Sequence, residues 1–197
     1  MDSLGELIEA LRCLPGVGPK SAQRMAYYLL QHSRQRGLHL ADCLEQAMTN
    51  IRQCTHCNNY TETPLCALCQ DASRDTHTLC VVESPSDLAA IEQTRSYKGR
   101  YFVLMGKISP LDGMGASEIG LPQLCLQAKT LNVTEIILAL GASVEGQTTC
   151  HFIREMLQDT AINISQLAQG IPSCGELEYL DSNTISYALR NRANFYA

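Results

Sequence analysis

Two Cys-x-x-Cys pairs constrain the fold of this chain more than any other feature. Eight residues separate the pairs, which consist of Cys54 with Cys57 and Cys66 with Cys69. Four thiolates at this spacing can close a tetrahedron around one ion, the geometry that structural zinc prefers. A redox pair or a chance arrangement is the alternative. We expect one structural Zn²⁺ that folds this segment and catalyses nothing, with His56 a bystander inside the first pair.

The composition indicates a soluble protein. The chain has 197 residues, of which 45% are hydrophobic, and no apolar run approaches the length of a membrane span. Residues 1–6 lack the basic start and apolar core of a signal peptide. Ten cysteines without a secretion signal indicate reduced thiols, and the six outside the two pairs are expected to be small buried side chains. We therefore expect a cytoplasmic, nucleoid-associated protein.

A glycine-bracketed stretch near the N-terminus predicts an anion-binding hairpin between two helices. Gly16 and Gly18 flank an apolar residue, and Lys20 and Arg24 follow, four positions apart, where a helical pattern starts. The first N–H groups of a helix lack intrahelical acceptors and carry partial positive charge, so phosphate binds well there. A plain helix corner that needs glycine for a positive φ is the alternative. We favour sequence-independent contact with the DNA backbone.

The distribution of charge limits where DNA could bind. A net charge of −5 argues against a surface that binds nucleic acid everywhere. Residues 1–36 nevertheless carry five basic and three acidic side chains, which favours contact at this end. Arg95, Lys98 and Arg100, with two tyrosines interleaved, form a second candidate surface. A solvated loop is an equally good interpretation of that stretch.

Apolar periodicity predicts helices first, and strands alternating with helices after the cysteine pairs. The first helices are expected at 3–13, capped by Ser3, and at 21–30 and 40–51. Short apolar runs predict strands at 78–82, 101–105, 135–140 and 162–167. Further helical patterns lie at 85–91, 121–131, 147–157 and 181–192. The chain is therefore expected to be an α+β protein of several domains, one of them an α/β unit with a mainly parallel sheet.

Acidic side chains follow two of the predicted strands. Glu83 comes directly after the first strand, and Glu145 follows the third after a short turn. Open α/β sheets bind ligands at the carboxyl ends of their strands. Residues 141–143 offer no further carboxylate, so we do not expect two-metal phosphotransfer, although one or two carboxylates can hold Mg²⁺ weakly. The glycine-bearing loop 109–115 fits a turn or a packing contact equally well.

Over essentially its whole length the chain resembles the RecR family of bacterial recombination mediator proteins. The features that carry the resemblance are the hairpin, the four cysteines and the acid-bearing α/β unit, in this order. Further matching stretches are residues 81–83, 109–113, 144–146, 170–172 and 177–179. The resemblance implies a helix-hairpin-helix domain at 1–53, a four-cysteine zinc finger at 54–76, a Toprim domain at 77–171 and a C-terminal segment with a Walker B-like motif at 172–197.

The resemblance also implies an activity and a set of partners. Members of the family form ring-shaped tetramers by exchanging terminal domains, and the rings encircle or clamp DNA. They act with RecO, and separately with RecF, to help RecA onto single strands coated by single-strand-binding protein, without being enzymes. Lys20 and Arg24 match the family's DNA-contacting hairpin positions. Glu83 and Glu145 match its Toprim acids, which are associated with partner binding.

This sequence departs from the family pattern at three places. Gly141-Ala142-Ser143 stands where Asn-Pro-Thr is usual, Gln169 replaces a common arginine, and residues 173–176, ending in Glu176, replace a more glycine-rich stretch with an aspartate. Two other functions are alternatives. A magnesium-dependent nuclease or primase-like enzyme would use the Toprim unit, whereas a protein-docking module would make DNA contact secondary.

Overall fold

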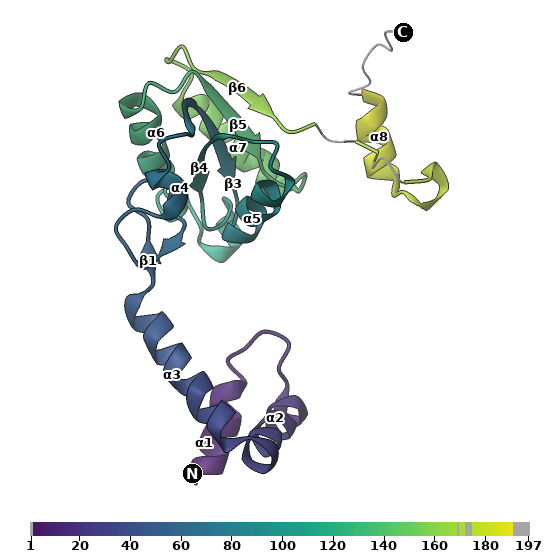
Figure 1. The fold of residues 1–197 in the computed structure, drawn as a ribbon. Helices are drawn as coiled ribbons and strands as arrows, with labels where there is room; N and C mark the ends of the chain where they lie inside the picture. Colours follow the sequence, from purple (N-terminus) through teal and green to yellow (C-terminus); the bar gives the residue numbers. More distant parts are fainter. Residues whose placement is uncertain (1, 169, 172–174, 191–197) are drawn as a thin grey trace. The chain divides into compact units, whose positions relative to one another are not determined.

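The computed structural model describes residues 2–168, 170–171 and 175–190, and the chain divides into two compact units, Met1–Ile51 and Arg52–Ala197 (Figure 1). Within these described ranges, no helix has both the length and the apolar character needed to cross a membrane. Residues 169, 173 and 174, where the sequence departs from the family pattern, lie outside the described part of the chain.

The first unit consists of the helices α1 (Ser3–Leu11), α2 (Pro19–His32) and α3 (Arg34–Asn50). Asp2, rather than the expected Ser3, caps α1, because its backbone is extended and its Oδ1 accepts a hydrogen bond from Gly5 N at 2.8 Å. The third helix begins six residues before the predicted start at position 40. Ser33 explains the difference, since its hydroxyl caps α3 by accepting from Arg36 N at 3.4 Å.

The second unit begins with a small zinc-finger fold of two antiparallel strands, β1 (Arg52–Gln53) and β2 (Tyr60–Thr61), followed by α4 (Ala67–Gln70). Cys54 N donates to Asn59 O at 2.7 Å within the turn between the strands, and Thr55 N donates to Pro64 O, beyond β2, at 3.0 Å. These elements were not predicted, because they are too short to show a hydrophobic period.

A four-stranded parallel sheet forms the centre of the second unit. Its strands are β3 (Asp75–Val82), β4 (Gly99–Val103), β5 (Glu135–Ala139) and β6 (Asn163–Gln166), in the order β4-β3-β5-β6. All four predicted strands are confirmed, with ends that differ by up to three residues. The connecting helices are α5 (Pro85–Thr94), α6 (Leu121–Thr130) and α7 (Val144–Met156), and the short 3-10 turn η1 (Pro110–Asp112) precedes α6.

The two faces of this sheet are covered differently (Figure 1). The larger core packs α6 and α7 against alternate residues of the strands, including Leu79, Phe102 and Ile136. On the other face α5 covers β3 and β4, through Leu88 and Val82 among others. The register pairs Val82 with Ala139, so the carboxyl ends of β3 and β5, where Glu83 and the turn 141–143 follow, lie side by side.

The described C-terminal residues form two short elements, the 3-10 turn η2 (Leu177–Tyr179) and the helix α8 (Ser182–Arg190). Asp181 caps the helix, because its Oδ1 accepts from Thr184 N at 3.0 Å and its Oδ2 from the Thr184 hydroxyl. The predicted tail helix is therefore confirmed for residues 182–190.

Candidate functional site

The hairpin between α1 and α2 leaves the start of α2 open. Gly16 has a φ of +76°, which only glycine adopts freely, and Val17 N donates to Leu14 O at 3.1 Å to close the turn. Gly18 is the N-cap of α2, has a φ of −81° and offers no side-chain acceptor. The glycine requirement for positive φ thus applies to Gly16 alone. The N–H groups of the first turn of α2 are left without a side-chain acceptor from the cap.

Lys20 and Arg24 lie one helical turn apart at this open end of α2, and both are exposed. The buried side of the same helix carries Ala22 and Ala26, which are fully covered. Among the described residues neither cation has an ion-pair partner. Two free cations therefore accompany the positive end of a helix, an arrangement suited to a phosphodiester backbone.

The four cysteines of the zinc finger come together as a closed metal site. Their sulfur atoms all lie within 4.8 Å of one another, the four residues are buried, and Cys57 Sγ is 3.4 Å from Cys66 Sγ. A zinc ion with bonds of about 2.3 Å to sulfur sets its ligands about 3.8 Å apart, so the residues fit this metal. They form the only cluster of three or more metal-binding side chains in the described chain.

The surroundings of these thiols shift three of their pKa values, in different directions. Burial opposes ionisation of Cys54, but backbone N–H groups of Cys57, Cys66 and His56 outweigh it and lower the pKa of Cys54 to about 7. The side chain of Cys69, and then burial, raises the pKa of Cys57, while burial raises the pKa of Cys66 to about 11. The set cannot hold four negative charges at neutral pH unless a metal compensates them.

The zinc finger is attached to the edge strand β4. Val103 N donates to Cys57 O at 2.8 Å, and Asn58 Nδ2 donates to Val103 O at 2.8 Å. Asn58 is buried and has a φ of +63°, a conformation that asparagine tolerates better than most residues. Sequence reasoning missed Asn58, although an asparagine next to a metal-binding cysteine is a signal of such a turn.

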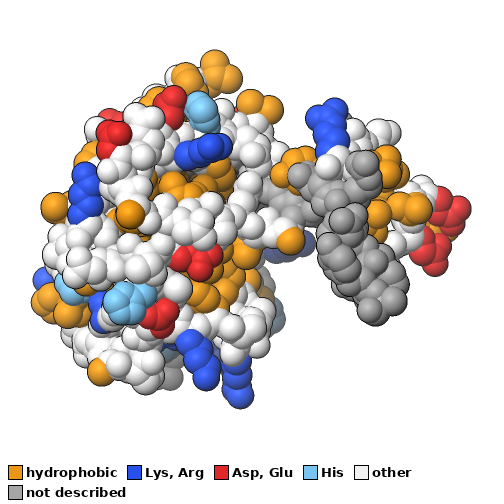
Figure 2. Space-filling model, turned by 90° about the horizontal axis from the view of Figure 1, so that it is seen from above, with side chains coloured by type: hydrophobic (Ala, Val, Ile, Leu, Met, Phe, Trp, Pro, Cys, Tyr) orange, Lys and Arg blue, Asp and Glu red, His pale blue; other side chains and the backbone are white. Residues whose placement is uncertain are grey.

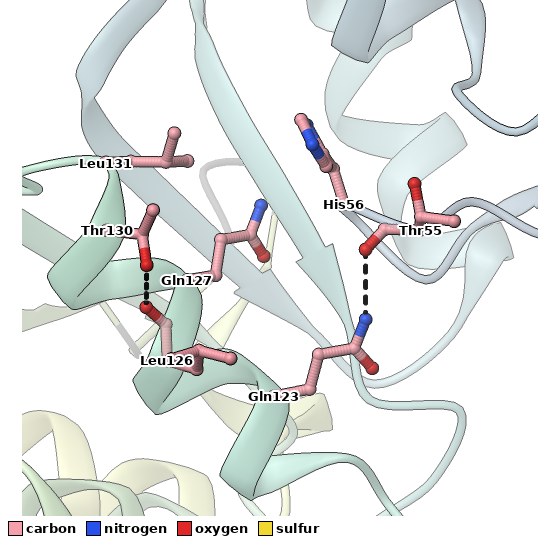
Figure 3. Close-up of a pocket in the computed structure, with 7 residues that line it drawn as sticks. All are labelled: Thr55, His56, Gln123, Leu126, Gln127, Thr130 and Leu131. Atoms are coloured by element: carbon pink, nitrogen blue, oxygen red, sulfur yellow. Dashed lines mark hydrogen bonds between the residues drawn. The ribbon is translucent and has the colours of Figure 1, made fainter.

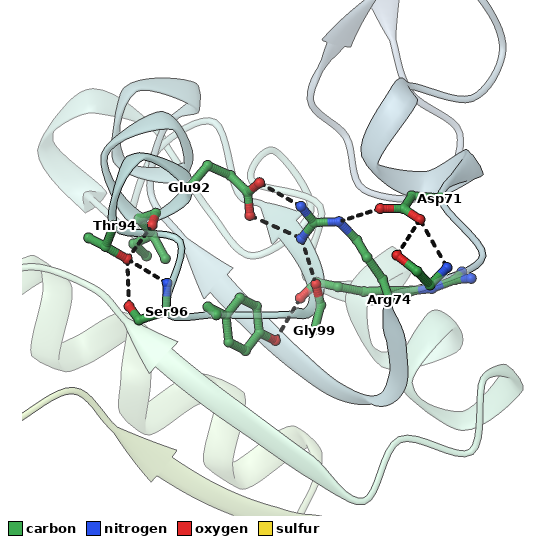
Figure 4. Close-up of polar contacts among 10 residues, drawn as sticks. Asp71, Arg74, Glu92, Thr94, Ser96 and Gly99 are labelled. Atoms are coloured by element: carbon green, nitrogen blue, oxygen red, sulfur yellow. Dashed lines mark hydrogen bonds and ion pairs between the residues drawn. The ribbon is translucent and has the colours of Figure 1, made fainter.

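At its other end the finger is held by Arg74, which sequence reasoning also missed (Figure 4). Its guanidinium donates to both carboxylate oxygens of Glu92, at 3.0 and 2.5 Å, and to Gly99 O at 3.0 Å. It also lies 5.7 Å from the centre of the Tyr101 ring and 3.7 Å from Asp71. Burial opposes ionisation of Glu92, but Arg74 outweighs it and lowers the pKa of Glu92.

Glu83 occupies the carboxyl end of β3 and contacts the turn that follows β5. Gly141 N donates to Glu83 Oε1 at 2.7 Å. A Cβ built on Gly146 would lie 2.2 Å from Gly141 O, so only glycine fits at that position of α7. The carboxylate of Glu83 therefore helps to hold a tight turn between β5 and α7.

Glu145 lies in the first turn of α7, in a different setting. Its carboxylate is 4.0 Å from Lys107 Nζ, which donates to the Ser143 hydroxyl at 3.1 Å. A hydrogen bond from its own backbone N–H, and then the Ser143 hydroxyl, lower the pKa of Glu145. Within the described residues no third metal-binding side chain joins Glu83 and Glu145. The pair offers negative charge at the sheet end but not a two-metal centre.

The second candidate surface for DNA, at residues 95–101, differs from the one that the sequence suggested. Arg95 and Lys98 are exposed, whereas Arg100 is half-buried. The tyrosines point inward, because Tyr101 is 2% exposed and Tyr97 packs beside it in the core. The tyrosines of this stretch therefore do not form the aromatic part of a binding surface, and the three cations remain as candidates. Figure 2 shows basic and acidic side chains scattered over this face of the described residues, without one large basic patch.

Known protein families match this chain domain by domain, in the order in which the structure has these domains. Four family models match: the RecR helix-hairpin-helix at 4–48, the RecR zinc-finger domain with four cysteines at 51–71, the Toprim domain at 77–168 and the RecR C-terminal segment at 170–193. The predicted fold class and the structural zinc are thereby confirmed.

Curated relatives match over nearly their whole length. "Recombination protein RecR" of Legionella pneumophila (strain Philadelphia 1) is 67% identical over 98% of this chain and 97% of that protein. The proteins of the same name from Coxiella burnetii and Xylella fastidiosa are each 51% identical, over 95% and 96% of this chain and 94% and 96% of theirs. The order of domains, the closed four-cysteine site and this identity together show that the chain belongs to the RecR family of recombination proteins.

Proposed function

We propose that this chain is a non-enzymatic DNA clamp in recombinational repair, which binds DNA without regard to sequence and promotes loading of RecA on gapped or single-stranded DNA. RecO and RecF are its proposed partners. The observation that carries the proposal is the open N-terminus of α2 with Lys20 and Arg24 exposed beside it. Such a site contacts phosphates, which every DNA sequence presents alike. Gly16 and Gly18 shape the turn that brings the backbone close.

One such hairpin is a modest site on a chain with a net charge of −5. Several copies held in one assembly raise the effective concentration of one another, so modest sites suffice. Arg95 and Lys98, which are exposed on the second unit, and the half-buried Arg100 are proposed as secondary contacts. The proposal of a clamp therefore depends on oligomerisation.

The first unit supports a homotetrameric ring formed by exchange of terminal domains. The only hydrophobic residues buried in its described part are Ala22 and Ala26. Larger apolar side chains of α3 are exposed, among them Leu38 at 67%, Leu44 at 52% and Met48 at 78%. About fifty residues without a large buried side chain do not make a stable core on their own, so these side chains favour burial against a second copy.

The carboxyl end of the sheet, where Glu83 and Glu145 lie, is a suitable surface for docking of a protein partner. Glu145 is half-buried, and Val144 beside it is 80% exposed. Leu111, in η1, is 99% exposed. Exposed apolar side chains close to carboxylates suit a partner with a basic surface, so Glu83 and Glu145 are proposed to contact RecO or RecF.

The test of DNA binding replaces Lys20 and Arg24 by alanine and follows affinity against salt concentration. We expect weaker binding and a log–log salt slope reduced by about 1.4–1.8, because two phosphate contacts are lost. Arg154→Ala with Arg190→Ala changes the net charge equally at exposed positions of the second unit and serves as the control. Unchanged affinity and slope in the hairpin variant would contradict the assignment.

Two further measurements address the alternatives. Zinc-loaded protein incubated with gapped or single-stranded DNA and Mg²⁺ should give no product; turnover that Glu83→Gln abolishes would instead establish an enzyme. Binding to a RecO-like partner is expected without DNA and should weaken in Glu83→Gln or Glu145→Gln. A partner interaction that persists in both variants would remove the Toprim acids from the interface.

A further inference from the structure

The outer face of α2 carries two exposed tyrosines as well as the two cations of the hairpin site. Tyr27 is 42% exposed and Tyr28 is 53% exposed. Counted from Lys20, Arg24 lies four positions on and the tyrosines seven and eight, and residues at these intervals share one side of an α-helix. The fully buried alanines of α2 mark the opposite side. Two aromatic rings therefore continue the exposed stripe that the cations begin.

Each ring is held by a neighbour on the same helix. Gln23 Nε2 donates to the Tyr27 hydroxyl at 3.2 Å. The ring of Tyr28 lies against the ring of His32, with their centres 5.2 Å apart and their planes inclined at 45°. These contacts restrict rotation of the side chains at the surface, so little conformational entropy remains to be lost when a flat ligand stacks on the rings.

The combination of groups determines what binds here. Cations contact phosphates, and aromatic rings stack on nucleobases, whatever the base. From Lys20 to Tyr28 the helix axis rises about 12 Å, the length of about three nucleotides of a stacked strand. A duplex keeps its bases stacked inside and presents only phosphates to such a face. A single strand offers bases and phosphates together and so uses all four side chains.

A second copy of the chain fits this face less well. Contact with protein would bury Lys20 and Arg24, which have no ion-pair partner among the described residues, and burial of an unpaired charge is costly. Leu44 and Met48 on α3 can be buried between copies without that cost. The outer face of α2 is therefore better suited to a nucleic-acid strand than to the interface of the ring.

Two other places in the second unit lack this combination. The cavity of about 180 Å³ around Gln127, between the zinc finger and α6, has no lysine, arginine or tyrosine among the described residues that line it (Figure 3). At residues 95–101 cations are exposed, but Tyr97 and Tyr101 pack in the core. The face of α2 differs from both because its rings and its cations are exposed side by side.

We propose that Tyr27 and Tyr28 form a stacking platform for bases of single-stranded DNA, while Lys20 and Arg24 contact the phosphates of the same strand. This inference rests on the proposed function and names the form of DNA that the hairpin site prefers. Stacking tolerates every base, so the platform adds affinity for single strands without making binding depend on sequence.

The test uses the full zinc-loaded chain with Tyr27→Leu and Tyr28→Leu combined, which keeps apolar bulk on the helix and removes both rings. Tyr60→Leu is the matched control, because Tyr60 lies in β2 of the second unit and is 58% exposed. The probes are a single strand, a strand of the same length made entirely of abasic sites, and a duplex. We expect the double variant to bind the single strand about five- to a hundredfold more weakly than wild type. Its affinity for the other two probes and its salt slope should equal those of wild type, because no phosphate contact changes.

A fluorescent variant reports stacking directly. The chain contains no tryptophan, so Tyr28→Trp introduces a single indole that can take the place of the tyrosine ring. Its emission should be quenched by the single strand and not by the abasic strand, and its affinity for the single strand should be retained. Tyr60→Trp, the matched control, should respond to neither probe.

The results that would overturn the platform differ from those that would overturn the clamp. Equal affinity of wild type for the intact and the abasic strand, or an equal loss of affinity for all three probes in the double variant, removes the platform and leaves the phosphate contacts in place. Failure of wild type to bind any of the three probes overturns the proposed function, and the platform with it.

Discussion

Arg74 and Glu92 form a two-point ion pair in which Nη1 and Nη2 of the guanidinium each donate to a different carboxylate oxygen, at 3.0 and 2.5 Å (Figure 4). Arg74 lies just after the zinc finger, and Glu92 lies on α5. The pair is mostly shielded, with the Arg74 side chain 12% and the Glu92 side chain 26% exposed. It therefore fixes the end of the finger against α5 more firmly than a surface pair could.

Glu92→Gln should lower the free energy of unfolding of the second unit by about 1–2 kcal/mol at neutral pH, because one charged partner of a partly buried pair is lost. The folded pKa of Glu92 is lower than its ordinary value of 4.5. The pair therefore contributes fully above about pH 4.5 and loses its contribution as the pH falls through the folded value. Urea unfolding at a series of pH values should show a smaller acid-induced loss in the variant.

Glu155→Gln is the matched control for this experiment. Glu155 pairs with His151 on the exposed side of α7 at 3.4 Å, and its side chain is 58% exposed. Its removal should change stability by less than about 0.5 kcal/mol. If the two variants behave alike, Arg74 does not hold the finger in the way described.

Removal of zinc should loosen one particular amide of β4. Val103 N donates to Cys57 O, whereas the neighbouring Leu104 N donates to Val82 O inside the sheet. Without metal the buried thiols lose their compensating charge, and the segment that carries Cys57 O unfolds. Hydrogen exchange after chelation should therefore accelerate at Val103 much more than at Leu104. Equal protection of both amides before and after chelation would show that the finger stays folded alone.

The hydroxyl of Thr149 should stabilise the loop that precedes α6. Thr149 is fully buried, and its Oγ1 accepts from Ile108 N at 2.9 Å and donates to Glu145 O at 2.7 Å. Thr149→Val leaves Ile108 N without a partner in the core and should cost about 1–3 kcal/mol in thermal or urea unfolding. The exposed Thr148, which donates only to Val144 O, offers the control Thr148→Val. A loss of stability in both variants would indicate a general effect of valine in α7.

Carboxylates introduced on α3 should dissociate the proposed ring. Leu38→Asp and Met48→Asp place carboxylates on side chains that are proposed to be buried between copies, so the solution mass should fall. Leu111→Asp, at an exposed position of the second unit, should leave the mass unchanged. Light scattering measures the mass, and circular dichroism checks that the helices persist. An unaltered mass in both α3 variants would place the interface elsewhere.

The sequence predicted those parts of the fold that a local pattern specifies. The strands β3 and β5 show as apolar runs because both of their faces are covered, and the zinc site shows in cysteine spacing alone. The N-cap of α1 was harder to predict, because Asp2 and Ser3 are both good N-cap residues and only the backbone conformation decides between them.

Contacts between distant segments could not be predicted. Asn58 bonds to Val103, 45 positions away, and the cavity at Gln127 exists only because the finger packs on α6. Tyr101 was a candidate for a basic surface, but in the pairing of β4 with β3 its side chain faces the core. Nothing in the local sequence records which way the side chains of a short edge strand face.

The attachment of the finger to β4 has a consequence for solubility. An edge strand with free backbone groups recruits strands of other chains and promotes aggregation. In this molecule Gly99 O accepts from Arg74, and Val103 bonds to Cys57 and Asn58, so both ends of the β4 edge are occupied and the Val103 end is covered by the metal-dependent finger. We therefore expect loss of zinc to free the Val103 end of this edge, so that a cell starved of zinc loses the protein to insoluble material before its sheet unfolds.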